Sequence, residues 1–405
     1  MKIAMLSAHS CPVGNLGTKD TGGMSVYIRE LAGELGRQGH NVDIYTRVHD
    51  PADPIIIDLG ERARLIHLKA GREDDIHKLA LYCYLPEFTC NLENFRKDNG
   101  PSYDIVFSHY WLSGWSGAYL QRWWQVPHVA MFHTLGAVKN TIGIGEEEPE
   151  LRTVTERETI AGCDRIIATT EREKGELIGH YGAQPEKIGI VPCGVNTEQF
   201  QPVDKHEARR RLGIFGEKVL LFVGRIDPLK GIDRLLSAVP LLRDRSGVRL
   251  VVIGGDEPRQ SDTDAIRKLA SELDIIDMVD FHGTVKHSEL YAYYSAADVC
   301  VVPSYHESFG LVALESLACG TPVVGTDTGA LKAIIRQGKT GYVAEDNSPG
   351  TLARYIDLAL SGHNGGIAPA ASIRESIADY TWSKIAPAIA TELSTALDNR
   401  VSLVA

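Results

Sequence analysis

The stretch "GGMSVYIRELAGELGRQGHNVDIYTR", residues 22–47, decides the fold class. Apolar side chains recur every four positions in its first part, at Tyr27, Leu31 and Leu35, and this spacing predicts a helix with one buried face. Its last part, "NVDIYTR", is typical of a buried strand, and "KIAMLSA" (2–8) predicts another strand before the helix. A strand, a helix and a second strand form a βαβ unit, which indicates a parallel sheet.

The same alternation continues along the chain and restarts in the second half. Further strands are predicted at 104–109, 128–133, 165–170, 218–224 and 249–255, with helical patterns between them that include 231–242. We therefore expect two doubly wound, Rossmann-like α/β domains that face each other across a cleft, spanning 1–195 and 196–379. The segment "VPCGVNTEQFQPV" (191–203) would join them, and a helix at about 380–405 would pack back on the first domain.

Composition excludes several classes of protein. The formal net charge of the 405-residue chain is −11, which argues against a nucleic-acid or membrane-surface binder. Its seven cysteines are scattered without a CxxC pair, as expected for reduced thiols in a cytoplasmic protein. No apolar run approaches the roughly 18 residues of a transmembrane helix, and the N-terminus does not resemble a signal peptide. No cluster has metal-ligand spacing, so we expect no bound metal and no tightly bound cofactor.

Two loops at the expected carboxyl ends of strands could hold phosphates. In "GTKDTGGMSVY" (17–27), Gly22 and Gly23 stand at a helix start, where backbone N–H groups can approach an anion, although such a pair is more often a tight turn. Arg225 and Lys230 in "VGRIDPLKGID" follow a strand and precede a helix, which suits a diphosphate. An ordinary solvated loop with surface cations is the alternative for the second loop.

The segment "SYHESFGLVALESLACG" (304–320) contains two carboxylates, Glu307 and Glu315. Glu307 lies in a loop, Phe309 and Gly310 would begin a helix, and Glu315 would lie in its second turn. A carboxylate on so apolar a helix is costly without a partner, and sugar or ribose hydroxyls are suitable partners for both glutamates. The alternative is that Glu315 marks the solvated face of the helix. His133 ends a predicted strand and is a weaker candidate, because a lone histidine is more often structural.

Taken together, these segments resemble the retaining GT-B glycosyltransferases of family four, over most of the chain. Within that family, "FHTLGAVKN", "EPELRTVTERE" and "GGMSVYI" are most similar to the inositol-phosphate N-acetylglucosaminyltransferases of mycothiol synthesis, and next to the sucrose-phosphate synthases. The resemblance implies that the N-terminal domain binds the acceptor and the C-terminal domain binds the nucleotide sugar.

The resemblance also implies roles for individual residues. The catalytic candidates are His133 beside the sugar, Arg225 and Lys230 on the diphosphate, and Glu307 on the transferred sugar's hydroxyls. The donor would also contact Gly22, Gly23, Phe309, Gly310, Leu311, Val312 and Glu315, the last of these at the ribose. The acceptor phosphate would lie among Lys78, Tyr110, Thr134 and Arg152, whose cations and hydroxyls can pair with it. Ser25 replaces an asparagine of the inositol-phosphate enzymes, and Met24 replaces a glutamine of the sucrose-phosphate enzymes.

The implied activity is transfer of glucose or N-acetylglucosamine, with retention, from a nucleotide diphosphate sugar to a small phosphorylated acceptor such as inositol phosphate. UDP is the nucleotide that we expect. The alternatives are transfer to fructose 6-phosphate, a nucleotide-sugar epimerase, a pyridoxal-phosphate phosphorylase and a two-lobed sugar-binding protein. The nucleotide sugar and the acceptor are the expected partners, and a homo-oligomer is left open.

Overall fold

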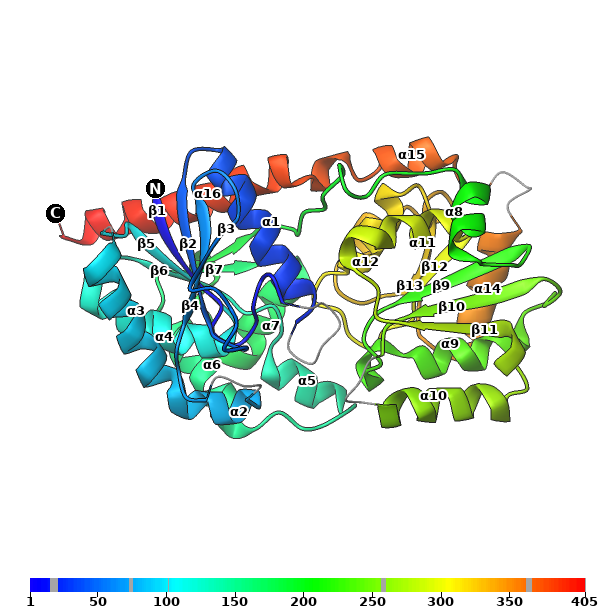
Figure 1. The fold of residues 1–405 in the computed structure, drawn as a ribbon, viewed down its shortest axis with the longest axis horizontal. Helices are drawn as coiled ribbons and strands as arrows, with labels where there is room; N and C mark the ends of the chain where they lie inside the picture. The colour runs from blue at the N-terminus through cyan, green and yellow to red at the C-terminus, as the bar shows by residue number, and fades with distance from the viewer. Residues whose placement is uncertain (15–20, 73–75, 101, 256–259, 362–365, 405) are drawn as a thin grey trace.

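Two parallel sheets organise the protein in a computed structural model, which describes residues 1–14, 21–72, 76–100, 102–255, 260–361 and 366–404 (Figure 1). The N-terminal sheet has the order β3-β4-β2-β1-β5-β6-β7-β8 and the C-terminal sheet has the order β11-β10-β9-β12-β13-β14. The N-terminal strands are β1 (Lys2–Leu6), β2 (Asn41–Arg47), β3 (Ile56–Asp58), β4 (Ala63–Leu68), β5 (Ile105–His109), β6 (His128–Met131), β7 (Arg165–Ala168) and β8 (Ile188–Ile190). The C-terminal strands are β9 (Lys218–Val223), β10 (Val248–Ile253), β11 (Val279–Gly283), β12 (Val299–Val302), β13 (Val323–Thr326) and β14 (Gly341–Ala344).

Helices cover both faces of each sheet, as Figure 1 shows. Those of the first half are α1 (Gly23–Arg37), α2 (Lys78–Leu81), α3 (Leu85–Asn99), α4 (Tyr110–Trp124), α5 (Gly136–Ile142), α6 (Glu150–Gly162) and α7 (Glu171–Tyr181). Those of the second half are α8 (Lys205–Leu212), α9 (Ile232–Ala238), α10 (Gln260–Glu272), α11 (Leu290–Ala296), α12 (Leu311–Ala318), α13 (Leu331–Ile334), α14 (Pro349–Leu360), α15 (Ala370–Glu375) and α16 (Trp382–Val404). No described helix is long and apolar enough to cross a membrane.

The βαβ unit that begins the chain is present as predicted. Strands β1 and β2 pair in parallel, with Lys2 opposite Asn41, and α1 connects them. The three periodic side chains of α1, Tyr27, Leu31 and Leu35, are all buried in the core. The prediction of two doubly wound α/β domains is confirmed, because all described strand pairs except β3 with β4 are parallel.

Several predicted boundaries are wrong. The helix predicted at 231–242 ends at Ala238 and continues as a 3-10 turn that contains Pro240, which has no N–H for a helical hydrogen bond. The strand predicted at 128–133 ends at Met131, and His133 adopts a left-handed backbone with a φ of 60°. The sequence did not predict the short edge strands β3 and β8, which leave little periodicity, or the internal strand β4.

The chain crosses between the two halves twice. The first crossing follows β8, and the second precedes α16, which runs along the N-terminal half (Figure 1) and packs against α1 and β7. The amide N–H of Val195 donates to the carbonyl oxygen of Tyr380 over 2.8 Å, so the two crossings are hydrogen-bonded to each other. Each half thus contributes its own sheet, and paired segments connect them.

Candidate active site

A pocket of about 230 Å³ lies between the two halves. His133 and Thr134 line it from the N-terminal half, and Glu307 and Ser308 line it from the C-terminal half. Thr169 Oγ1 donates to the carbonyl oxygen of Ser308 over 3.3 Å, which joins the two walls. Three of the predicted site residues, His133, Thr134 and Glu307, therefore share one pocket although their elements lie far apart in the chain.

Glu307 binds Lys230 on the C-terminal wall. Lys230 Nζ donates to Glu307 Oε1 over 2.6 Å, and Ser304 Oγ donates to the same oxygen over 2.8 Å. Burial alone would raise the pKa of Glu307, but the Lys230 ammonium and the Ser304 hydroxyl outweigh it and lower that pKa. Gly231 has a φ of 66°, and a Cβ there would lie 2.2 Å from the carbonyl oxygen of Pro303, so glycine lets the two loops meet.

The N-terminus of α12 faces the N-terminus of α1. A Cβ on Gly23 would lie 3.2 Å from Leu311 Cδ1, so the start of α1 approaches the start of α12 across the two halves. The first helical residue is Leu311, and Gly310 precedes it with a φ of 113°. The expected helix start at Phe309 is therefore two residues too early. The amides of Leu311 and Val312 belong to the first turn, where no acceptor exists within the helix. Residues 17–20 of the expected phosphate loop lie outside the described residues.

Glu315 has protein partners for both carboxylate oxygens. His287 Nε2 lies 2.7 Å from Oε1, and Tyr294 OH donates to Oε2 over 2.7 Å. Glu315 is 6% exposed, so the predicted need for a partner is met by these two side chains. Each carboxylate oxygen has a second lone pair for a ligand, and its assignment to the ribose stays a prediction.

Arg225 forms an ion pair within its own loop. Its guanidinium is 3.7 Å from the carboxylate of Asp227, and its side chain is 44% exposed. The role of Arg225 at the diphosphate also stays a prediction.

His133 is half-buried and uncharged at neutral pH. Burial lowers its pKa to about 3. Its Nε2 lies 2.9 Å from His109 Nδ1, and its ring packs edge-on against Tyr27. The second histidine, His109, is absent from the sequence analysis, although its position at the end of strand β5 is a signal of the same kind. A neutral His133 can exchange a hydrogen bond with a sugar hydroxyl through its remaining nitrogen, Nδ1.

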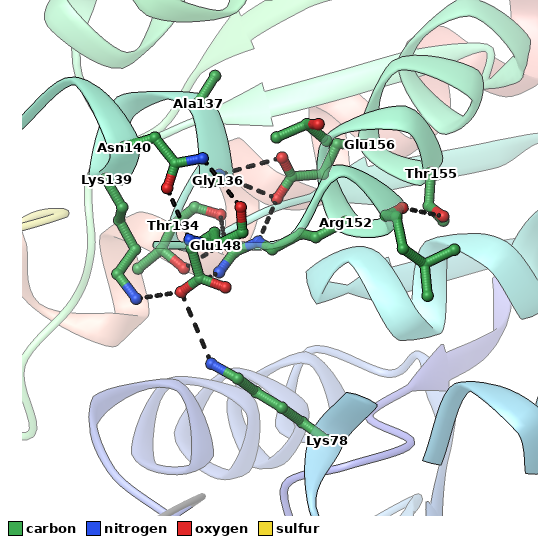
Figure 2. A network of polar contacts seen from close by, with 12 residues as sticks. Lys78, Thr134, Gly136, Ala137, Lys139, Asn140, Glu148, Arg152, Thr155 and Glu156 are labelled. Carbon is green, nitrogen blue, oxygen red and sulfur yellow. Dashed lines mark hydrogen bonds and ion pairs between the residues drawn. The ribbon is translucent and has the colours of Figure 1, made fainter. Parts of the chain in front are cut away.

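The predicted acceptor residues Thr134 and Arg152 are in direct contact (Figure 2). Arg152 is 1% exposed, and its Nη2 donates to the hydroxyl of Thr134 over 2.9 Å and to its carbonyl oxygen over 2.8 Å. Its Nε donates to Glu156 over 2.7 Å. Glu156 is fully buried and also accepts from the Gly136 amide and the Tyr181 hydroxyl, so the guanidinium is held rigidly.

Lys78 joins this cluster through a carboxylate that the sequence analysis missed, Glu148. Glu148 Oε1 lies 3.6 Å from Lys78 Nζ and 2.9 Å from Arg152 Nη1, and it accepts a hydrogen bond from Lys139 Nζ. Burial alone would raise the pKa of Glu148, but the three cations outweigh it and lower that pKa to about 2. Lys139 was also missed, although it lies in the quoted segment "FHTLGAVKN" and Glu148 immediately precedes "PELR".

The other two predicted acceptor residues are Tyr110, which contacts Arg152, and Ser25, which does not. The Tyr110 ring is 4.9 Å from the Arg152 guanidinium and stacks on His9 at 4.3 Å. Ser25 is fully buried, and its hydroxyl is 2.6 Å from the hydroxyl of Ser10. The structure thus brings Lys78, Tyr110, Thr134 and Arg152 together, and no described contact joins Ser25 to them.

Two doubly wound domains with a pocket between them define the GT-B class of glycosyltransferases. A sucrose-phosphate synthase from Thermosynechococcus elongatus has this arrangement and superposes with a TM-score of 0.89 at 32% identity, over 98% of this chain and 99% of the other. The model of Glycosyltransferase Family 4 matches residues 21–199, and the model of Glycosyl transferases group 1 matches residues 204–375. The chain belongs to this glycosyltransferase family.

Relatives with a curated name support the same membership. A D-inositol 3-phosphate glycosyltransferase of Corynebacterium glutamicum is 35% identical and covers 98% of each chain. One of Streptomyces scabiei is 40% identical over 88% of this chain and 82% of its own. The protein is therefore a glycosyltransferase, and most of its length aligns with these relatives.

Proposed function

We propose that this enzyme transfers glucose or N-acetylglucosamine from a nucleotide diphosphate sugar to a hydroxyl of a small phosphorylated acceptor. UDP is the nucleotide that the sequence resemblance implies, and inositol phosphate is the acceptor that the names of the relatives suggest. The reaction would retain the anomeric configuration, and the enzyme would act in the cytoplasm.

One observation carries the proposal: the cation cluster adjoins the pocket that contains Glu307. Thr134 lines that pocket and also accepts a hydrogen bond from Arg152, whose neighbours include Lys78. A phosphate bound among these cations would hold the rest of a small acceptor next to a sugar bound at Glu307. This placement supports an acceptor that carries both a phosphate and a reactive hydroxyl.

The proposed mechanism assigns charge stabilisation to the C-terminal wall. As the bond between the anomeric carbon and the phosphate oxygen breaks, Lys230, Arg225 and the first-turn amides of α12 would stabilise the charge on the diphosphate. The acceptor oxygen bonds to the same face of the anomeric carbon, and its proton passes to the departing phosphate oxygen. Glu307 would orient sugar hydroxyls, and neither it nor Glu315 serves as a nucleophile.

Transfer to fructose 6-phosphate is the second candidate. The similarity to a sucrose-phosphate synthase favours it, and the cation cluster would suit its phosphate equally well. Met24 counts against it, because this partly buried apolar side chain stands where those enzymes carry glutamine.

A donor-by-acceptor screen tests both candidates. UDP-, GDP- and ADP-linked sugars would be combined with inositol phosphate, fructose 6-phosphate and glycerol phosphate, and nucleotide release and the product's anomeric configuration would be measured. We expect UDP release with inositol phosphate and none with unphosphorylated inositol. Transfer to unphosphorylated acceptors alone would contradict the proposal, and a new sugar formed without an acceptor would indicate an epimerase.

A single variant links the screen to the cluster. Lys78→Met should raise KM for the phosphorylated acceptor about tenfold or more, because one of the phosphate's cations is lost. The exposed Lys97 of α3 offers a matched control, since Lys97→Met removes the same charge from the same half of the protein. Equal kinetics for the two variants would show that Lys78 does not bind the acceptor.

A further inference from the structure

Glu148 occupies an unusual position for a carboxylate in a site that is proposed to bind a phosphate. Lys78, Lys139 and Arg152 approach it from three separate elements, α2, α5 and α6, and all three are nearest to the same oxygen, Oε1 (Figure 2). The residue is 6% exposed. Three cations around one buried oxygen form an anion-binding arrangement, and in this structure the anion is part of the chain.

The backbone of Glu148 is held independently of its side chain. Asn140 Oδ1 accepts from the Glu148 amide over 2.7 Å, and Asn140 Nδ2 donates to the Glu148 carbonyl oxygen over 2.9 Å. These two bonds fix the loop against α5. The position of the carboxylate is therefore set by the fold, and not only by attraction to the cations.

The three cations differ in how firmly they are held. Arg152 has Glu156 and Thr134 as further partners and is almost fully buried. Lys78 and Lys139 have side chains that are 25% and 22% exposed. Lysine side chains have flexible stems and three donors on a compact charge, so these two ammonium groups can turn towards a second anion while Arg152 stays in place.

We propose that Glu148 is a specificity-determining residue that competes with the acceptor phosphate for Lys78 and Lys139. This inference rests on the proposed function of the site. While the site holds no acceptor, Glu148 keeps the three cations together. A phosphate must displace the Glu148 carboxylate from the two lysines, so inorganic phosphate binds weakly. A phosphorylated acceptor binds more tightly, because its remaining atoms make further contacts. The same proposal makes Lys139 a further phosphate-binding residue.

Calorimetric titration with inorganic phosphate, in the absence of any donor, tests the competition. Glu148→Gln should bind inorganic phosphate roughly tenfold more tightly than the unaltered enzyme, because a competing charge next to the anion is gone. Glu147→Gln is the matched control, since Glu147 is exposed, carries the same charge and precedes Glu148 directly. The control should leave phosphate affinity unchanged. Equal or weaker phosphate binding by Glu148→Gln would overturn the proposal.

Lys139→Met should change the affinity for inorganic phosphate in the opposite direction, and this test remains available if Glu148→Gln does not fold. Lys139→Met should weaken binding of inorganic phosphate several-fold. If the cluster had only a structural role, Glu148→Gln and Lys139→Met would both bind phosphate more weakly. Unchanged binding by Lys139→Met would show that Lys139 does not bind phosphate.

Steady-state kinetics test the specificity, with inorganic phosphate as an inhibitor. Glu148→Gln should reduce the ratio between the inhibition constant of inorganic phosphate and KM of the phosphorylated acceptor. If no phosphorylated compound is an acceptor at all, the proposed function fails, while the titrations still decide whether Glu148 competes with phosphate.

Discussion

Each side of the pocket has a carboxylate paired with lysine, but the two are built differently: Glu307 lines the pocket and is half-buried, whereas Glu148 is buried in the cluster next to it. On the C-terminal wall, Glu307 receives one lysine and one hydroxyl, Lys230 and Ser304, from two loops of one sheet. On the N-terminal wall, Glu148 receives three cations from three helices, and the deepest of them, Arg152, is itself shared with Glu156. A local pair can be opened by a ligand at small cost, whereas the buried network is part of the core of its domain. The comparison therefore predicts that changes on the first wall mainly affect turnover and that changes on the second also affect folding.

The largest effect is expected for Arg152→Met. Removing this guanidinium leaves Glu156 and Glu148 without their buried partner, which should cost about 3–5 kcal/mol of unfolding free energy. Denaturant unfolding monitored by circular dichroism measures it. Arg157→Met is the control, because Arg157 is exposed on the same helix, and it should change stability by about 0.5 kcal/mol or less. A loss of under 1 kcal/mol of unfolding free energy for Arg152→Met would show that the N-terminal wall is not part of the stabilising core.

Lys230→Met should instead lower kcat by about 100-fold or more, because a cation that stabilises the departing diphosphate is removed. Its side chain is 28% exposed, so we expect a smaller loss of stability than for Arg152→Met. Initial rates with saturating donor and acceptor provide the measurement. Lys268→Met, on the exposed face of α10, serves as the control. Near-normal turnover of an Arg225→Ala, Lys230→Ala double variant would show that neither residue is part of the catalytic machinery.

Tyr294→Phe examines a third carboxylate, Glu315. The substitution removes one of its two hydrogen bonds, which should cost about 1.5–3 kcal/mol of stability, because a bond to a charged group is lost. If the ribose also binds Glu315, KM for the donor should rise while KM for the acceptor stays constant. Tyr291→Phe on the same helix is the control. A change in acceptor KM alone would place Glu315 outside the donor site.

The last prediction concerns the dependence of stability on pH. Burial lowers the pKa of His9, His128 and His133 to about 3, and all three belong to the N-terminal half. Between pH 6.5 and 3 the unfolded chain binds a proton at each of these sites and the folded chain does not. Stability should therefore fall as the pH decreases, by about 1.4 kcal/mol per pH unit for each histidine.

Unfolding measured between pH 6.5 and 4.5 tests this dependence. His128→Gln should reduce the slope of unfolding free energy against pH by the contribution of one histidine, because residue 128 then binds no proton in the folded or the unfolded state. His206→Gln should leave the slope unchanged, since His206 is exposed. An unaltered slope in His128→Gln would mean that this histidine is not kept neutral by burial.

Sequence patterns predicted much of the C-terminal wall. Glu307, Gly310 and Glu315 lie within nine residues, and Lys230 follows its strand in one short loop, so spacing along the chain alone indicated a site. The patterns could not show that Glu315 would find His287 and Tyr294 as partners, because those side chains come from a neighbouring segment. The start of α12 was misplaced by two residues, because Gly310 has a left-handed backbone and the helix begins only after it, at Leu311.

The N-terminal wall could not be assembled in this way. Lys78, Thr134 and Arg152 entered the analysis through resemblance to a family, and the carboxylate at their centre, Glu148, was not recognised. In sequence it is one of three consecutive glutamates, at 146–148, and nothing in the pattern distinguishes it from its two exposed neighbours. Only the fold of the loop against Asn140 turns this one side chain inward.

The sequence by itself determined the class of this protein: the βαβ periodicity, the two domains and the motif of the glycosyltransferase family. These features are local, because helix and strand periods and the carboxyl ends of strands depend on neighbouring residues in the chain. The tertiary structure decided which charges meet. Lys78, Lys139, Glu148 and Arg152 form one cluster only because three helices converge beside the pocket, and the strength of their interaction depends on a burial that no spacing along the chain encodes.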